Sequence, residues 1–186
     1  MNEASELPLP ETVSSRVVLR AKLFDVEEAT IRFHDGHEAE RVTVRHPGAV
    51  ALVVVDDEDR WLLVRQYRHP TRGSLLEVPA GTREDGEAPE VTAAREVREE
   101  TGYAAASLVH LGGTWMAPGF CSEYIDFYLA RGLSPEPLPQ DDDEYIGEPV
   151  RLSEGEVEAA IVSGEISDAK SVVALTLVRL HRGREG

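Results

Sequence analysis

The feature that most constrains this chain is a crowd of carboxylates at the end of a predicted helix. Residues 95–100, REVREE, hold three glutamates and two arginines just before Gly102, a residue typical of a left-handed helix stop. Glu96 and Glu100 would share one helical face, where like charges four residues apart destabilise a helix by about 0.2–0.5 kcal/mol per pair. The helix dipole also disfavours carboxylates in the last turn. The pattern therefore indicates either a solvated charged surface or a divalent cation, which prefers oxygen ligands.

Composition and charge exclude several classes of partner. The 186 residues, 41% of them hydrophobic, suffice for one globular domain with a small additional sheet. A net charge of −16 disfavours nucleic acid and anionic membranes as partners. The single cysteine, Cys121, excludes an internal disulfide and fits a reducing compartment. No signal peptide is recognisable and the apolar runs are shorter than a membrane span, so we expect a cytoplasmic protein.

The spacing of apolar and turn residues predicts an α+β fold, with helices packed on a mixed or mostly antiparallel sheet. Strands are predicted as two in 16–33, one at 40–46, two in 49–67, and one each at 75–81, 106–112 and 123–130. Helices are predicted from about Ala88 to Thr101, from a capping box at Ser153 to about Ser163, and after Ser167 and Asp168. Residues 133–149 hold four prolines and six acids and are expected to form a loop.

A longer pattern surrounds the crowded carboxylates. It runs Gly81, five residues, Glu87, seven residues, Arg95-Glu96-Val97, one residue, Glu99-Glu100, one residue, Gly102 and Tyr103. This resembles the signature of the Nudix hydrolases, G-x5-E-x7-R-E-U-x-E-E-x-G-U with U bulky and apolar, at every fixed position. The resemblance implies an α/β/α sandwich with a mixed sheet, and cleavage of a nucleoside diphosphate linked to another group. We expect an N-terminal arm and small antiparallel sheet at 1–46, and the Nudix hydrolase domain at 47–186.

The resemblance also assigns roles to residues of the signature. Divalent metal, Mg²⁺ or alternatively Mn²⁺, would be bound by Glu96, Glu99, Glu100 and the Ala80 carbonyl. Hard cations prefer such oxygen ligands and keep waters for substrate phosphates. Arg95, with Glu87, is interpreted as a brace that holds the carboxylates in one rotamer. Bound metal would neutralise the diphosphate and activate a water for attack on phosphorus, so Glu99 and Arg95 are counted among the catalytic residues.

Residues outside the signature resemble the ADP-ribose pyrophosphatases. Pro118, followed by Gly119, lies fifteen residues after Tyr103, where that subfamily usually has a proline. In VRQYRHP the arginine at the strand end, Arg68, would contact a substrate phosphate. The N-terminal strands resemble a sheet through which this subfamily exchanges contacts between two subunits, so we expect a homodimer.

These resemblances imply Mg²⁺-dependent hydrolysis of ADP-ribose to AMP and ribose 5-phosphate. The alternative within the family is another nucleotide sugar, such as GDP-mannose or ADP-glucose. A non-catalytic ADP-ribose sensor is disfavoured, because it would not need the intact carboxylates Glu96, Glu99 and Glu100.

The acidic loop supplies the candidate general base. Family members carry a catalytic glutamate in a mobile loop at this place, and Glu144 is the candidate here, with Asp142 in reserve. The six histidines show no ligand spacing, and Cys121 is expected to be an inert thiol. Trp61 and Trp115 are expected to lie in the core.

Overall fold

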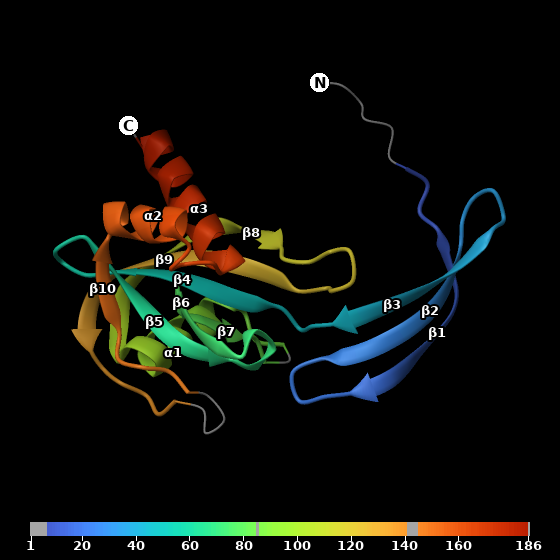
Figure 1. The fold of residues 1–186 in the computed structure, drawn as a ribbon, viewed down its shortest axis with the longest axis horizontal. Helices are drawn as coiled ribbons and strands as arrows, with labels where there is room; N and C mark the ends of the chain where they lie inside the picture. Colours follow the sequence, from blue (N-terminus) through green and yellow to red (C-terminus); the bar gives the residue numbers. More distant parts are fainter. Residues whose placement is uncertain (1–6, 85, 141–144, 186) are drawn as a thin grey trace. The chain divides into compact units, whose positions relative to one another are not determined.

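The chain divides into two compact units. The computed structural model describes residues 7–84, 86–140 and 145–185 (Figure 1). The N-terminal unit comprises Met1–Pro47 and Ala117–Glu123, and the larger unit comprises Gly48–Met116 and Tyr124–Gly186. The N-terminal unit therefore includes residues 117–123, which the sequence assigned to the Nudix domain.

The N-terminal unit is built on an antiparallel sheet, which confirms the predicted small sheet. Its strands are β1 (Glu11–Arg20), β2 (Asp25–Arg32) and β3 (Glu38–Arg45), in the order β1-β2-β3. Residues 117–123 lie along β3, because Val44 N donates to Phe120 O at 2.8 Å and Ser122 N donates to Val44 O at 2.9 Å. Every residue of the edge strand β1 is exposed, so nothing in the described chain covers this strand.

The larger unit contains a mixed sheet. Within the described residues its seven strands are β4 (Ala49–Val55), β5 (Arg60–Arg68), β6 (Gly73–Glu77), β7 (Ala80–Thr82), β8 (Tyr103–Trp115), β9 (Tyr124–Pro135) and β10 (Val150–Ser153). Their order is β10-β5-β4-β9-β8, while β6 pairs with β5 and β7 pairs with β4. A short 3₁₀ helix, η1 (His69–Thr71), separates β5 from β6. The β4–β9 pair is parallel and the other pairs are antiparallel.

Helices cover both faces of this sheet, as expected for an α/β/α sandwich (Figure 1). Helix α1 (Pro89–Thr101) packs Ala93 and Val97 against alternate residues of β4. Helices α2 (Glu154–Ser163) and α3 (Ala169–Glu185) pack against the opposite face. All residues of β4 are buried, because helices cover the strand on both sides. The described chain contains no helix long and apolar enough to cross a membrane.

Local signals place the helix ends where the sequence predicted them. Pro89 occupies the first turn of α1, and Gly102 ends the helix with φ of 78°. The predicted capping box of α2 is confirmed, since Ser153 Oγ accepts from Glu156 N at 3.3 Å and the Glu156 carboxylate accepts from Ser153 N at 2.7 Å.

Several details of the sequence-based prediction were wrong. Strands β8 and β9 extend well beyond 106–112 and 123–130, because their mutual pairing continues from Tyr103 to Trp115. Trp61 is buried at 1% exposure as predicted, whereas Trp115 is 55% exposed and makes an edge contact with Tyr124.

Candidate active site

The crowded carboxylates lie on the second half of α1, where it faces the strands β4 and β7. Glu96 and Glu100 are buried, and the side chain of Glu99 is largely covered. The last turn of a helix is an unfavourable place for three carboxylates. Their charge is therefore compensated by specific contacts rather than by open solvent, which excludes the solvated-surface interpretation.

Arg95 supplies most of that compensation. Its Nη1 donates to Glu96 Oε1 at 2.7 Å and to Glu99 Oε2 at 2.7 Å. Its Nη2 donates to the carbonyl oxygen of Thr82 at 3.3 Å and lies 3.6 Å from Glu87 Oε2. Burial by itself disfavours the guanidinium charge, but Glu96 and Glu99 outweigh burial and raise the pKa of Arg95. Arg95 therefore lies in contact with both Glu96 and Glu99, and its role as a brace stays a prediction.

Glu87 joins the cluster from the loop before α1. Thr92 Oγ1 donates to Glu87 Oε2 at 2.8 Å, and the amide of Glu84 donates to the same oxygen at 3.2 Å. Burial would raise the pKa of Glu87, but these hydrogen bonds and the nearby Arg95 lower it below its usual value. Glu87 therefore stays ionised and fixes the loop that leads into α1.

The first two residues of β7, Ala80 and Gly81, lie directly against the end of α1. The amide of Ala80 donates to Glu100 Oε2 at 3.1 Å. A Cβ added to Gly81 would overlap the carboxylate of Glu96, so glycine is required for this close approach. The glycine of the signature therefore has a steric role here.

The donor set fits a divalent cation in kind, and protein groups bind the three signature carboxylates of α1 in this structure. Glu96 and Glu99 both bind Arg95, whereas Glu100 binds the amide of Ala80. Within the described residues, no group of three or more His, Cys, Asp or Glu side chains is arranged to hold a metal ion. Carboxylate oxygens are still the ligand type that Mg²⁺ prefers, and the absence of a side chain at Gly81 makes room for the carboxylate of Glu96.

Arg68 lies at the end of β5 and is already bound to a carboxylate. Its Nε donates to Glu77 Oε1 at 2.9 Å, and its side chain is 36% exposed. Lys170 Nζ donates to the other oxygen, Glu77 Oε2, at 2.8 Å. Sequence reasoning missed Glu77 and Lys170. The available signal was a lone acid within the apolar segment LLEVPAG and a lone lysine at the start of an apolar helix.

Four further predicted site residues lie outside the described part of the larger unit. Pro118 and Gly119 belong to the N-terminal unit, on the segment that lies along β3. Glu144 and Asp142 lie outside the described residues. The roles of these four residues stay predictions.

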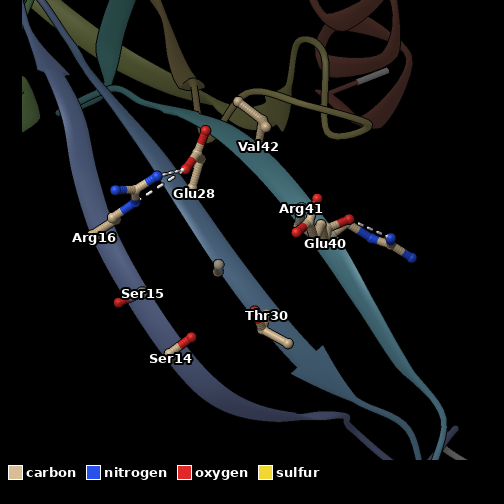
Figure 2. A pocket seen from close by; sticks show the side chains of 9 residues that line it. Ser14, Ser15, Arg16, Glu28, Thr30, Glu40, Arg41 and Val42 are labelled. Atoms are coloured by element: carbon tan, nitrogen blue, oxygen red, sulfur yellow. Dashed lines mark hydrogen bonds and ion pairs between the residues drawn. The ribbon is translucent and has the colours of Figure 1, made fainter.

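A hollow of about 470 Å³ lies on the N-terminal sheet, and it contains no residue of the signature. Figure 2 shows that its walls are side chains of β1, β2 and β3. Arg16 Nη2 donates to Glu28 Oε2 at 2.7 Å across it. This ion pair is more than a third exposed on both sides, which is typical of a surface contact of small energy.

An α/β/α sandwich with this strand order, and with a cluster of glutamates and an arginine on α1, defines a Nudix-type hydrolase. Residues 44–161 match the NUDIX domain family. The ADP-ribose pyrophosphatase of Bacillus subtilis is 34% identical over 172 residues, which cover 91% of this chain and 92% of that protein. The methanol dehydrogenase activator of Bacillus methanolicus is 34% identical over 173 residues, covering 92% and 93%.

A solved structure described as an ADP compounds hydrolase matches with a TM-score of 0.84 and 28% identity, covering 98% of this chain and 99% of that chain. This match includes the small antiparallel sheet as well as the sandwich, because it spans nearly the whole chain. The chain belongs to the Nudix family and is a hydrolase.

Proposed function

We propose that this enzyme hydrolyses the diphosphate of ADP-ribose to AMP and ribose 5-phosphate, in a reaction that needs Mg²⁺ or Mn²⁺. The observation that carries the proposal is the intact signature on α1, with Arg95 and Glu87 bracing the carboxylates. The likeness to an ADP-ribose pyrophosphatase along nine-tenths of both chains supports the choice of substrate. A relative named as an activator of another enzyme matches to the same degree, so the substrate must be tested directly.

Glu96, Glu99, Glu100 and the Ala80 carbonyl are proposed to hold the metal. For this, Glu96 and Glu99 must turn from Arg95, whose charge they now share. A divalent cation bound there would neutralise the diphosphate and lower the pKa of a bound water. Arg95 would then keep Glu87 in place and stop the remaining carboxylates from repelling one another.

Substrate contacts are proposed for Arg68, Pro118 and Gly119, and Glu144 is the proposed general base. Loss of a general base costs about 10² to 10⁴ in turnover. We therefore expect Glu144→Gln to lower kcat by that factor with little change in the dissociation constant, titrated separately in Ca²⁺. A large loss in Asp142→Asn with none in Glu144→Gln would move the role to Asp142.

The enzyme is further proposed to be a cytoplasmic homodimer. The single cysteine supports a reducing compartment. The exposed edge strand β1 supports a second copy as the partner, because it carries apolar side chains with no cover in the described chain.

The substrate proposal is tested with a panel of nucleotide sugars in Mg²⁺, with released AMP, GMP and phosphate as the readout. We expect AMP and ribose 5-phosphate from ADP-ribose, with the highest kcat/KM of the panel. A higher kcat/KM with GDP-mannose or ADP-glucose would assign the other substrate. Tight binding of ADP-ribose without turnover would indicate a sensor and contradict the proposal.

A further inference from the structure

Glu77 is a buried carboxylate that binds one cation with each of its oxygens. It ends β6 and is 1% exposed. Arg68 approaches Oε1, with Nε at 2.9 Å, and Lys170 Nζ approaches Oε2 at 2.8 Å. An isolated carboxylate at this depth would be strongly disfavoured, so the two cations together make its burial tolerable.

Lys170 is held in place by the first turn of α3. It is 6% exposed, and its Nζ also lies 3.2 Å from Asp168 Oδ1. The other oxygen of Asp168 accepts from the amide of Ser171 at 3.0 Å and from its hydroxyl at 2.8 Å. This is the geometry of a helix N-cap. The first turn of α3 therefore holds the ammonium group of Lys170 in place, although the lysine side chain is long.

The same turn also binds the backbone that leads to the signature glycine. Ser171 Oγ accepts from the amide of Val78 at 2.9 Å. Two residues further on, Ala80 N donates to Glu100 Oε2 on α1 at 3.1 Å. The short segment from Glu77 to Ala80 is thus held by α3 at its beginning and by α1 at its end.

The charges of this network affect what Arg68 can bind. If Lys170 were absent, Arg68 alone would neutralise the Glu77 carboxylate. The charge of the Arg68 guanidinium would then be fully compensated by Glu77. Arg68, Lys170, Glu77 and Asp168 together carry no net charge, whereas the same groups without Lys170 would carry a net charge of −1. Arg68 has a partly exposed side chain and so retains attraction for an anion.

We propose that Lys170 is a positioning residue: through Glu77 it sets the charge and place of Arg68, and with Ser171 it fixes the bend before Gly81. Lys170 does not touch the substrate in this proposal. The proposal rests on the function given above, since it concerns binding of a substrate diphosphate. It adds to that function a residue outside the signature, on the first turn of α3.

The test compares Lys170→Met with Lys170→Arg and with the double variant Glu77→Gln/Lys170→Met. Changes to residues that hold a functional group in place commonly cost about 10–100-fold. We expect Lys170→Met to raise KM about tenfold with kcat within about twofold, because Glu77 then engages Arg68 fully. Lys170→Arg should keep KM within about threefold of the parent, since a cation is retained. The double variant should recover KM to the same range, because the buried carboxylate is removed with its cation.

The matched control is Lys22→Met, which changes the only other lysine of the chain, an exposed one between β1 and β2. A merely structural ion pair predicts a different pattern. The melting temperature and the active fraction would then fall in Lys170→Met, while KM would stay at the parent value in all the variants. That result would overturn the proposal. If Lys170→Met does not fold, a spectroscopic measurement on the chain that keeps Lys170 decides.

A second measurement does not depend on the substrate. With lysine labelled by ¹³C, the chain gives side-chain signals from Lys22 and Lys170 alone. We expect Arg68→Gln to move the Lys170 signal and leave that of Lys22 in place, since only Lys170 shares a carboxylate with Arg68. An unmoved Lys170 signal would overturn the coupling. Failure of the parent enzyme to cleave ADP-ribose would contradict the substrate proposal alone, and KM would then be measured with the substrate that the panel identifies.

Discussion

Arg95 is the residue on which the electrostatics of the carboxylate cluster depend. It contacts Glu87, Glu96 and Glu99, and its side chain is 26% exposed. Removing one partner from a buried ion pair leaves the other charges uncompensated, which costs far more than the loss of a surface pair. A bound divalent cation would take over part of this compensation, so the stability of the apo and metal-bound forms should respond differently to a change at Arg95.

We expect Arg95→Gln to lower the free energy of unfolding by about 2–3 kcal/mol in chelator, somewhat below the value for a fully buried pair because Arg95 is partly exposed. Part of this loss should return on addition of Ca²⁺. Urea unfolding with and without Ca²⁺ measures both effects. The control is Arg98→Gln on the same helix, whose surface pair with Glu136 should contribute less than about 1 kcal/mol. Equal losses of unfolding free energy in the two variants would show that Arg95 contributes no more to stability than a surface arginine.

Glu100→Gln tests the role of the most buried signature carboxylate. An amide can still accept the hydrogen bond from Ala80 N, and the change removes a negative charge from the helix C-terminus. We therefore expect an unchanged or higher melting temperature in chelator, together with loss of turnover in Mg²⁺. The control is Glu84→Gln. Glu84 is exposed in the loop before α1, at a position where the signature allows any residue. Turnover at the parent level in Glu100→Gln would contradict its assignment as a metal ligand.

The elements differ in how far the sequence could predict them. Helix ends are set by local chemistry, so Gly102 and the capping box at Ser153 could be read from neighbouring residues. Strand ends depend on distant partners, and β8 continues through the alanines after Tyr103 only because β9 pairs with them. The ion pair of Glu77 and Lys170 joins residues 93 positions apart, which no local pattern can indicate.

The contrast between local and distant contacts also explains which features of the site could be predicted. The signature placed the glutamates, Arg95 and Gly81 together because they lie on one helix and on the bend before it. It could not predict that Arg95 lies between Glu96 and Glu99, since this depends on side-chain rotamers. Nor could it predict that Arg68 is bound by a carboxylate from another strand.

The capping box of α2 gives a prediction at the scale of the element. Ser153→Ala removes the acceptor for Glu156 N, and loss of an N-cap costs about 1 kcal/mol. We expect a melting temperature lower by about 2–4 °C, with kcat/KM unchanged because α2 carries no proposed site residue. Ser153→Asp, which keeps an N-cap acceptor, should retain the parent melting temperature. A loss of the same size in both variants would show that the cap is not the cause.

At the scale of the whole molecule, an enzyme of net charge −16 must bind a substrate that is also negative. The overall field opposes the approach of a diphosphate, although salt at physiological strength screens it beyond about 8 Å. Binding must therefore rely on local cations: the arginines of the larger unit and the proposed divalent metal. The large negative charge also disfavours association of copies except where apolar surface compensates, which directs attention to β1.

The last prediction concerns that strand. Val17 and Leu19 of β1 are 38% and 54% exposed, and the strand lies at the edge of its sheet. We expect light scattering of the parent protein at micromolar concentration to give twice the 20.5 kDa of one chain. Glu at both positions should yield the monomer, because burying unpaired carboxylates in an interface is strongly unfavourable. Val162→Glu, at an exposed position of α2, should leave the dimer intact.

Substitution tests this better than a shortened chain beginning at Arg45. Such a chain would also lose Val44, whose backbone binds Phe120 and Ser122 beside Pro118 and Gly119. A fall in activity could then come from a disturbed loop and not from the lost partner. With the double substitution the loop keeps its hydrogen bonds, so a monomer with reduced kcat/KM would support a contribution of the N-terminal unit to the partner's site. A parent protein that is already monomeric, or a monomeric variant with full activity, would contradict the proposal.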